Sequence, residues 1–222
     1  MQRRFHDRAE AGIALANGLR KYATARDRAV VVALPRGGVP IGHEIARALD
    51  VPLDVCIVRK LGVPGHEELA MGAVASGGVI VLNYDVIRGC SVPRQSIDRS
   101  AAAERAEIER RERLFREGRP PVDLHGVTVL LVDDGLATGA TMRAAVSAIR
   151  QRGAASAVVA VPVGPKDTCD LLRKQADEVI CLSMPEPFEA VGEWYDKFPQ
   201  VSDDEVRQLL KDHQSPPAPA GR

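Results

Sequence analysis

The sequence predicts an α/β protein built on a doubly wound, mostly parallel sheet. Short β-branched runs alternate with amphipathic stretches, as where "AVVVALP" (29–35) precedes "VPIGHEIARALD" (39–50). A strand, a helix and a further strand in succession form a βαβ unit, and such units build parallel sheets. The run "VTVLLVDD" (127–134) is apolar on both faces, which is typical of a central strand in a parallel sheet.

The composition is that of a soluble globular protein. The 222 residues are 45% hydrophobic and 27% charged, with 30 Lys plus Arg and 30 Asp plus Glu. Because the net charge is zero, the composition shows no excess of positive charge of the kind that binds nucleic acid or an anionic membrane. The opening "MQRRFHDRAEAG" has no apolar stretch behind its charges, and no run of about 18 apolar residues occurs. We therefore expect a cytoplasmic protein that binds neither nucleic acid nor membrane.

The elements of the first half follow from local patterns. Residues 5–25 carry Ile13, Ala16, Leu19 and Ala23 at helical spacing, which predicts an amphipathic helix. The strand at 29–35 and the helix at 39–50 are followed by a second strand, "PLDVCIVRK" (52–60). Two glycines and a proline predict a loop over 61–67, and two apolar runs around Ser76-Gly77-Gly78 predict a hairpin.

The second half begins with a long charged helix over 96–118, whose charges are expected to form a solvated face. After the strand at 127–134, a helix at 141–153 ends at Gly153. The remaining predicted elements are a strand at 156–164, a helix at 166–176, a strand at 178–183 and a final helix before residue 212. The predicted organisation is an N-terminal helix (1–28), a core (29–183) carrying a flexible loop and hairpin (61–83) and the charged helix (96–118), a hood with the C-terminal helix (184–214), and a disordered tail (215–222).

The segment "VLLVDDGLATGAT" (129–141) carries the strongest functional signal. Ligands of open α/β sheets bind beyond the carboxyl ends of the strands, and Asp133 and Asp134 lie at such an end. The loop that follows contains Gly139 and enters a helix near Thr141, so it presents free N–H groups and the positive end of the helix dipole. This loop suits a phosphate, whereas the carboxylates suit hydroxyl groups or a divalent cation. A sugar phosphate satisfies both requirements.

Rival phosphate motifs account for this segment less well. The chain contains no GxG, and the P-loop spacing of Gly37 and Gly42 is followed by His-Glu where Lys and Ser or Thr are needed. A phospho-receiver domain can also end its first strand in two acids, but too little chain follows Asp133 to complete one. Asp134 could simply cap a turn, but a second acid and a loop rich in hydroxyls favour a ligand site.

The segment resembles the phosphoribosyl-pyrophosphate (PRPP) motif of the type I phosphoribosyltransferases, which joins apolar residues, two acids and a five-residue phosphate loop ending in Gly-x-Thr. The resemblance extends over roughly residues 29–183 and is closest to a bacterial subgroup without an assigned substrate. It implies that Asp133 and Asp134 hold the ribose 2- and 3-hydroxyls and help indirectly to place Mg²⁺. It implies that the 5-phosphate is wrapped by Ala137, Thr138, Gly139, Ala140 and Thr141.

The resemblance also implies a pyrophosphate loop after the first strand, where "LPRGGVP" (34–40) stands. Gly37 and Gly38 let the backbone approach a diphosphate closely, and Arg36 supplies a fixed charge. Family members often carry a cis peptide in this loop, which we expect between Arg36 and Gly37. A simple tight turn would account for the glycines alone.

A mobile loop is expected after the second strand, where "RKLGVPGHEE" (59–68) stands. Arg59 and Lys60 end that strand and could reach the leaving pyrophosphate, although a solvated strand end explains them equally well. Together with Arg36, Asp133 and Asp134, Lys60 completes the set of residues to which the resemblance assigns a catalytic role.

Base choice in this family rests with a variable hood, for which the candidate is "MPEPFEAVGEWYDKFPQ" (184–200). Phe188, Trp194 and Tyr195 could stack on a planar base, or could simply pack the hood onto the core. Lys166 could contact a base carbonyl or lie on the surface. Members that act on 6-oxopurines usually carry an acid at the first phosphate-loop position; Ala137 stands there, which disfavours hypoxanthine and guanine.

The implied reaction is displacement of pyrophosphate from C1 of the ribose by a nitrogen nucleophile, with Mg²⁺ as cofactor and an oxocarbenium-like transition state. The protein would position PRPP and a nucleobase and exclude water, a role in nucleotide salvage. The alternative is a regulator that binds PRPP or a nucleotide without turnover; such regulators usually add a DNA-binding segment, and none is visible here. Dimers are common among relatives, so a homodimer is an open expectation.

Overall fold

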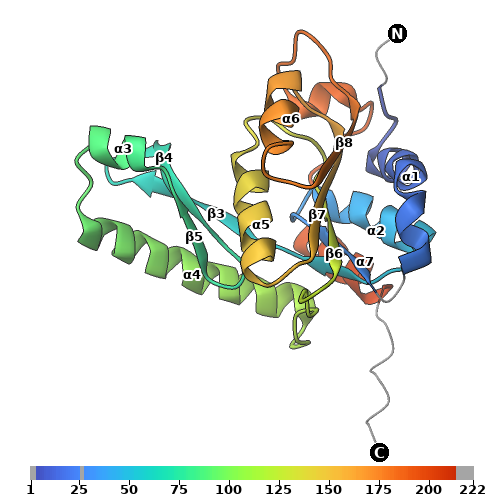
Figure 1. Ribbon diagram of the computed structural model, residues 1–222, viewed down its shortest axis with the longest axis horizontal. Coiled ribbons are helices and arrows are strands. Elements are labelled where there is room, and N and C mark those ends of the chain that lie inside the picture. The colour runs from blue at the N-terminus through green and yellow to red at the C-terminus, as the bar shows by residue number, and fades with distance from the viewer. Residues whose placement is uncertain (1–3, 26–27, 214–222) are drawn as a thin grey trace, which may run out of the picture.

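The computed structural model describes residues 4–25 and 28–213 and has the α/β architecture that the alternation predicts (Figure 1). A five-stranded parallel sheet forms the centre, with strand order β2-β1-β6-β7-β8. Its strands are β1 (Ala29–Ala33), β2 (Leu53–Val55), β6 (Thr128–Val132), β7 (Ser156–Val163) and β8 (Glu178–Ser183). The tail predicted over 215–222 lies outside the described residues.

Helices cover both faces of this sheet. One face carries α1 (Arg8–Gly18) and α2 (Gly38–Leu49), and the other carries α5 (Ala140–Gln151) and α6 (Lys166–Leu172). Successive residues of a strand point to opposite faces, so Val31 packs with α1 and α2 whereas Val30 and Val32 pack with α5 and α6. All five residues of β1 are buried, as expected when both faces are covered. The predicted doubly wound sheet is therefore confirmed.

A second, antiparallel sheet projects from the core, and we call it the arm (Figure 1). Its strands are β3 (Val58–Val63), β4 (His66–Ala75) and β5 (Val79–Leu82), followed by α3 (Tyr84–Gly89) and the long helix α4 (Arg94–Arg116). Helix α4 runs along the arm and is the charged helix predicted over 96–118. No helix of the described residues has both the length and the apolar content needed to cross a membrane.

The arm corrects two predictions. The single strand predicted over 52–60 is two strands, because β2 joins the core sheet and β3 joins the arm. The loop predicted over 61–67 is the end of β3, a tight turn and the start of β4. Its glycines serve the hairpin: Gly65 has a φ of +81° in the turn, and a Cβ at Gly62 would lie 2.6 Å from the carbonyl oxygen of Glu67. The hairpin predicted around Ser76-Gly77-Gly78 is confirmed as β4 and β5.

The helix predicted over 5–25 is shorter than expected. α1 ends at Gly18 and a 3-10 helix, η1 (Arg20–Ala25), follows. Asp7 caps the start of α1 by accepting the N–H of Glu10, whose carboxylate accepts the N–H of His6 in return. Ile13, predicted on the apolar face, is 51% exposed, because the buried face of α1 is formed by Ala11, Gly12, Leu15 and neighbouring residues instead.

The hood follows β8 and returns the chain to α1. It contains a 3-10 helix, η2 (Val191–Trp194), and leads into α7 (Asp203–Lys211), which packs against α2 and α4. The N-terminal segment pairs with it: Phe5 N–H donates to the Trp194 carbonyl at 2.9 Å, and Asp196 N–H donates to the Phe5 carbonyl at 2.9 Å. The N-terminal segment is therefore held against the hood.

Candidate functional site

The predicted ligand loops lie side by side at the carboxyl edge of the central sheet. Strands β1 and β6 are parallel neighbours in register from Ala29↔Thr128 to Ala33↔Val132. The loops that follow them, 34–37 and 133–139, therefore leave the sheet at adjacent points, and Leu34 N–H donates to the Val132 carbonyl at 2.8 Å. This is the edge at which open α/β sheets bind ligands.

Gly37 and Gly38 allow these two loops to touch. A Cβ at Gly37 would lie 1.9 Å from Oδ2 of Asp134, and one at Gly38 would lie 2.6 Å from the Val132 carbonyl oxygen. No side chain fits in either place, so the close approach requires glycine. The loop predicted for pyrophosphate and the acidic pair predicted for ribose thus form one continuous surface.

The loop that ends in Gly139 and Thr141 runs into the N-terminus of α5 as predicted. Gly139 is the N-cap with a φ of +70°, and no side chain caps the helix. The first N–H groups of α5 thus have no carbonyl partner within the helix, and the helix dipole adds positive potential there. Thr168, at the start of α6, supports the loop because its hydroxyl donates to the Ala137 carbonyl at 3.0 Å. This arrangement can bind a phosphate.

Asp133 and Asp134 end β6 in a desolvated setting. Burial raises the pKa of Asp133 well above its usual range, and the negative charge of Asp134 adds to the rise. Burial also raises the pKa of Asp134, and the guanidinium of Arg8 opposes that rise. Two neighbouring carboxyl groups that are shielded from water can accept hydrogen bonds from donors such as ribose hydroxyls.

Arg8 reaches this pair from the first turn of α1. Its Nε and Nη2 both donate to Oδ2 of Asp134, at 3.0 and 2.8 Å, and its side chain is 10% exposed. Its Nη1 donates to the Pro199 carbonyl at 2.7 Å, and its guanidinium lies 3.8 Å from the ring centroid of Phe198. Arg8 therefore joins the acidic pair to the hood.

The hood aromatics divide into two groups. Tyr195 is 3% exposed, stacks on Phe198 with ring centroids 4.9 Å apart, and donates its hydroxyl to the Asp134 carbonyl at 2.6 Å. Of the two roles considered for Tyr195, this placement favours packing of the hood over stacking on a base, because the ring is buried and already stacked on Phe198. Phe188 and Trp194 are half-buried, and the Trp194 indole Nε1 is buried without a hydrogen-bond partner in the described structure.

The structure places Arg36 in the loop between β1 and α2, with its Nη1 3.6 Å from Asp203 of α7. The cis peptide expected between Arg36 and Gly37 lies one residue earlier, between Pro35 and Arg36. Lys166, at the start of α6, is exposed and pairs with Asp170 at 2.5 Å. Arg36 thus lies within the first loop, and the side chain of Lys166 is held by its own helix.

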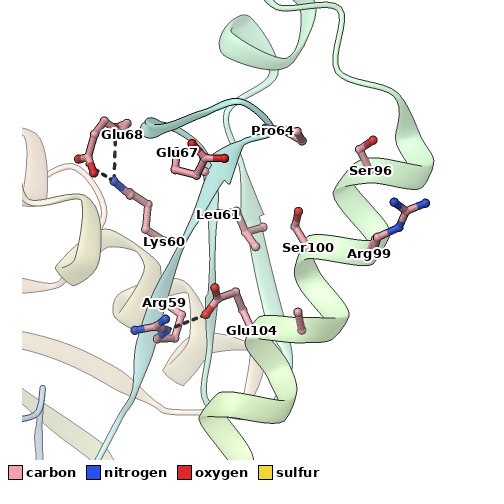
Figure 2. Close-up of a pocket in the computed structure, with 12 residues that line it drawn as sticks. Arg59, Lys60, Leu61, Pro64, Glu67, Glu68, Ser96, Arg99, Ser100 and Glu104 are labelled. Carbon is pink, nitrogen blue, oxygen red and sulfur yellow. Dashed lines mark hydrogen bonds and ion pairs between the residues drawn. The ribbon is translucent and has the colours of Figure 1, made fainter.

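Arg59 and Lys60 lie apart from this cluster, on β3 of the arm. Arg59 Nε donates to Glu104 of α4 at 2.6 Å, and Lys60 Nζ lies 3.2 Å from the carboxylate of Glu68. Both residues line a groove of about 600 Å³ beside α4. In Figure 2, Arg59 points toward Glu104 of α4 and Lys60 points toward Glu68. No residue of the 34–38 loop or of the 133–141 segment lines this groove.

Three contacts at the site were not anticipated from sequence: Arg8 on Asp134, Thr168 on Ala137, and the Tyr195 hydroxyl on Asp134. Arg8 left a weak signal, because a cation in the first turn of a helix opposes the helix dipole and so suggests a tertiary partner. Nothing in the local sequence marks Thr168 or the Tyr195 hydroxyl, since each bonds to a backbone carbonyl at least 31 residues away.

Comparison with known proteins agrees with this geometry. A family model described as the phosphoribosyl transferase domain matches residues 3–197. Two Mycobacterium tuberculosis proteins, Rv0571c and MT0597, which are provisionally named phosphoribosyl transferases, are 48% identical over 207 residues. That match covers 93% of this chain but 46% of those proteins, so the chain spans about half the length of these relatives.

Two further similarities are informative. The crystal structure of TT1426 from Thermus thermophilus shares 42% identity and a TM-score of 0.82, covering 96% of this chain and all of that one. The Bifunctional protein PyrR of Deinococcus radiodurans is 32% identical over 124 residues, which is 54% of this chain and 66% of that protein. The family match spans the core, both ligand loops and most of the hood, and we conclude that the chain belongs to the phosphoribosyl transferase domain family.

Proposed function

We propose that the chain transfers the 5-phosphoribosyl group of PRPP to a nitrogen nucleophile and releases pyrophosphate. The observation that carries the proposal is the direct packing of the 35–38 loop against Asp133 and Asp134, beside the open N-terminus of α5. PRPP bears a diphosphate, a diol and a phosphate on one ribose, and the proposal assigns one of these groups to each of the three neighbouring segments. Membership of the phosphoribosyl transferase domain family supports the proposal.

For each part of the substrate, the site offers groups that could bind it. The amides of residues 139–141 and the hydroxyls of Thr138 and Thr141 would hold the 5-phosphate. Asp133 and Asp134 would accept hydrogen bonds from the ribose hydroxyls. The backbone of Gly37 and Gly38, with the charge of Arg36, would hold the diphosphate.

The protein would act mainly by positioning and electrostatics. The bond from C1 to the diphosphate breaks while a nitrogen lone pair forms the new bond to C1, so negative charge grows on the leaving group. Fixed N–H dipoles and Arg36 stabilise that charge, and burial against the hood excludes water that would compete as nucleophile. None of these steps requires a covalent intermediate with the protein.

Mg²⁺ fits this site as a partner of the substrate. No group of three or more His, Cys, Asp or Glu side chains that could hold a metal gathers anywhere in residues 4–25 and 28–213. The two carboxylates alone are too few for a cage, but Mg²⁺ in such sites takes one or two carboxylates together with substrate phosphates. When bound, it would neutralise charge on the diphosphate.

We propose a nucleobase as acceptor. Ala137 offers no carboxylate to exchange a proton with a 6-oxopurine, which favours an adenine-like or pyrimidine acceptor. The half-buried rings of Phe188 and Trp194 remain the hood aromatics that could contact it. Lys166 could reach a base carbonyl only after leaving Asp170, with which it is paired.

The proposal is tested by incubating the purified chain with PRPP, Mg²⁺ and a panel of purine and pyrimidine bases, and measuring pyrophosphate release. We expect release that depends on one class of base. Calorimetry with PRPP and Mg²⁺ should give a binding isotherm, and Gly37→Ala should weaken binding more than roughly tenfold, because the added Cβ collides with Asp134.

Gly89→Ala is the matched control, because a Cβ at Gly89 meets nothing within 4 Å and the residue lies at the end of α3. It should bind PRPP as the wild type does. Failure of the wild type to bind PRPP would overturn the proposal. Tight PRPP binding without pyrophosphate release for any base would instead identify a PRPP-binding regulatory protein.

A further inference from the structure

Arg8 occupies an unusual position for a helix-start residue. Its side chain points inward from α1 and makes three hydrogen bonds, two of them to the same carboxylate oxygen of Asp134. The residue is 8% exposed, and its guanidinium lies over the ring of Phe198. A desolvated guanidinium bonded to a carboxylate is among the stronger polar contacts in proteins. A role as a solvated surface charge therefore does not explain why an arginine stands at position 8.

The contact engages only one side of the Asp134 carboxyl group. Both bonds from Arg8 end on Oδ2, and within the described residues no hydrogen bond to Oδ1 is present. Both oxygens lie against the pyrophosphate loop, 1.9 and 3.1 Å from where a Cβ at Gly37 would stand. Arg8 thus holds the Asp134 carboxyl group through Oδ2, and Oδ1 keeps its capacity to accept a hydrogen bond.

Arg8 also ties this carboxyl group to the hood. It donates to the Pro199 carbonyl, while the Tyr195 hydroxyl donates to the backbone carbonyl of Asp134. Tyr195 and Phe198 stack on one another, and Phe198 covers the guanidinium. One arginine therefore holds the hood and the Asp134 carboxylate together.

We propose that Arg8 is a positioning residue of the ribose site that holds Asp134 against the 35–38 loop. Its two hydrogen bonds occupy Oδ2 of Asp134, and Oδ1 accepts a hydrogen bond from a ribose hydroxyl. This inference rests on the proposed function, since it assumes a ribose beside Asp134. Lysine could not replace it, because a single ammonium nitrogen cannot bond to Asp134 through two N–H groups and reach Pro199 as well.

The test compares three ligands by calorimetry in the presence of Mg²⁺: PRPP, ribose 5-phosphate and inorganic pyrophosphate. The variants are Arg8→Met and Arg8→Lys. We expect each to weaken PRPP and ribose 5-phosphate by roughly 10- to 100-fold, the effect of losing hydrogen bonds to a charged group. Pyrophosphate has no hydroxyl for Asp134, so its affinity should change by less than roughly twofold.

Arg4→Met is the matched control. Arg4 also joins the N-terminal segment to the hood, through the Tyr195 carbonyl at 3.4 Å and Asp196 at 3.6 Å, but it does not touch Asp134. It should leave all three affinities unchanged. Arg8→Lys keeps the positive charge, so it still tests the inference if Arg8→Met fails to fold. Circular dichroism verifies the fold of each variant.

The outcomes separate the two proposals. A wild type that does not bind PRPP refutes the proposed function. A wild type that binds PRPP while both Arg8 variants bind PRPP equally well refutes the inference alone. Equal losses of PRPP and pyrophosphate affinity in folded Arg8 variants would also refute it, because they would show general damage to the site.

Discussion

At the scale of single residues, the site holds acidic groups where folding alone would not place them. Asp133 is desolvated beside a second carboxyl group, and the resulting rise in its pKa means that its ionised form is disfavoured in the folded chain. Groups of this kind are typical of functional sites, where binding and catalysis are gained at some cost in stability. Arg8 offsets part of that cost for Asp134 but makes no bond to Asp133 within the described residues.

Asp133→Asn should stabilise the ligand-free protein at neutral pH. The folded pKa of Asp133 lies above the unfolded value, so between those two values the native state binds more protons and stability falls as pH rises. Asp133→Asn has no ionisable group at this position, so its unfolding free energy lacks this dependence on pH. Its amide oxygen can still accept the hydrogen bond from the Asp134 N–H, which Asp133 accepts at 2.9 Å. Urea unfolding at several pH values should show a gain that is absent below about pH 4 and exceeds about 1 kcal/mol at high pH.

Asp123→Asn is the control for this series. Asp123 is exposed and accepts the His125 N–H at 3.0 Å, so it makes a similar local hydrogen bond without burial. Its substitution should leave stability within about 0.5 kcal/mol at every pH. A gain for Asp133→Asn that does not vary with pH would contradict the account, because it would not arise from ionisation.

At the scale of elements, α1 can present Arg8 to the site only because it approaches α2 closely. The two helices meet at Gly12, where a Cβ would lie 2.8 Å from Cβ of Glu44 and 2.9 Å from the Ile41 carbonyl oxygen. Arg8 lies one turn before Gly12, and residues four apart share a helix face. The crossing of α1 over α2 thus sets the distance from Arg8 to Asp134.

Gly12→Ala should therefore weaken PRPP binding from a position outside the site. The new methyl group meets backbone atoms of α2 that cannot yield, so α1 must shift, at a cost of about 1–3 kcal/mol in unfolding free energy. PRPP affinity should fall roughly tenfold as Arg8 moves away from Asp134. Gly18→Ala, on the same helix, meets only Ile180 at 3.7 Å and should leave both quantities unchanged. An unaltered affinity in Gly12→Ala would show that Arg8 follows Asp134 independently of α1.

At the scale of the whole molecule, the sequence predicted the core well and the arm poorly. β-branched runs separated by amphipathic helices allow few folds other than a wound parallel sheet, and the DD…GAT segment follows β6 at the carboxyl edge of that sheet. The division of 52–60 between two sheets was not predictable, because no glycine, proline or other turn signal separates Val55 of β2 from Val58 of β3. Arg8 was missed because its partner is 126 residues away, and only the tertiary crossing of α1 and α2 brings them together.

The hairpins of the arm do not themselves attach it to the core. A buried ion pair is one of the contacts that does. Arg116, near the end of α4, donates from Nε to Asp54 of β2 at 2.8 Å and from Nη2 to the Val55 carbonyl at 2.9 Å. Asp54 and Arg116 are 5% and 6% exposed. Asp54 also accepts the Val122 N–H at 3.0 Å, which fixes the chain that returns from α4 to β6.

Arg116→Met should lower the unfolding free energy by about 3–5 kcal/mol, because it leaves the Asp54 carboxylate buried without its cation. Urea denaturation measures this loss, and hydrogen exchange should show α4 and the arm opening before the central sheet. Arg113→Met, one turn earlier on the same helix, removes a side chain that is 69% exposed and lies 3.9 Å from Glu109, so it should change stability by less than about 0.5 kcal/mol. Adding Asp54→Asn to Arg116→Met should restore part of the loss, since the uncompensated charge is then removed. If the double variant is no more stable than Arg116→Met, the loss does not arise from the uncompensated charge of Asp54.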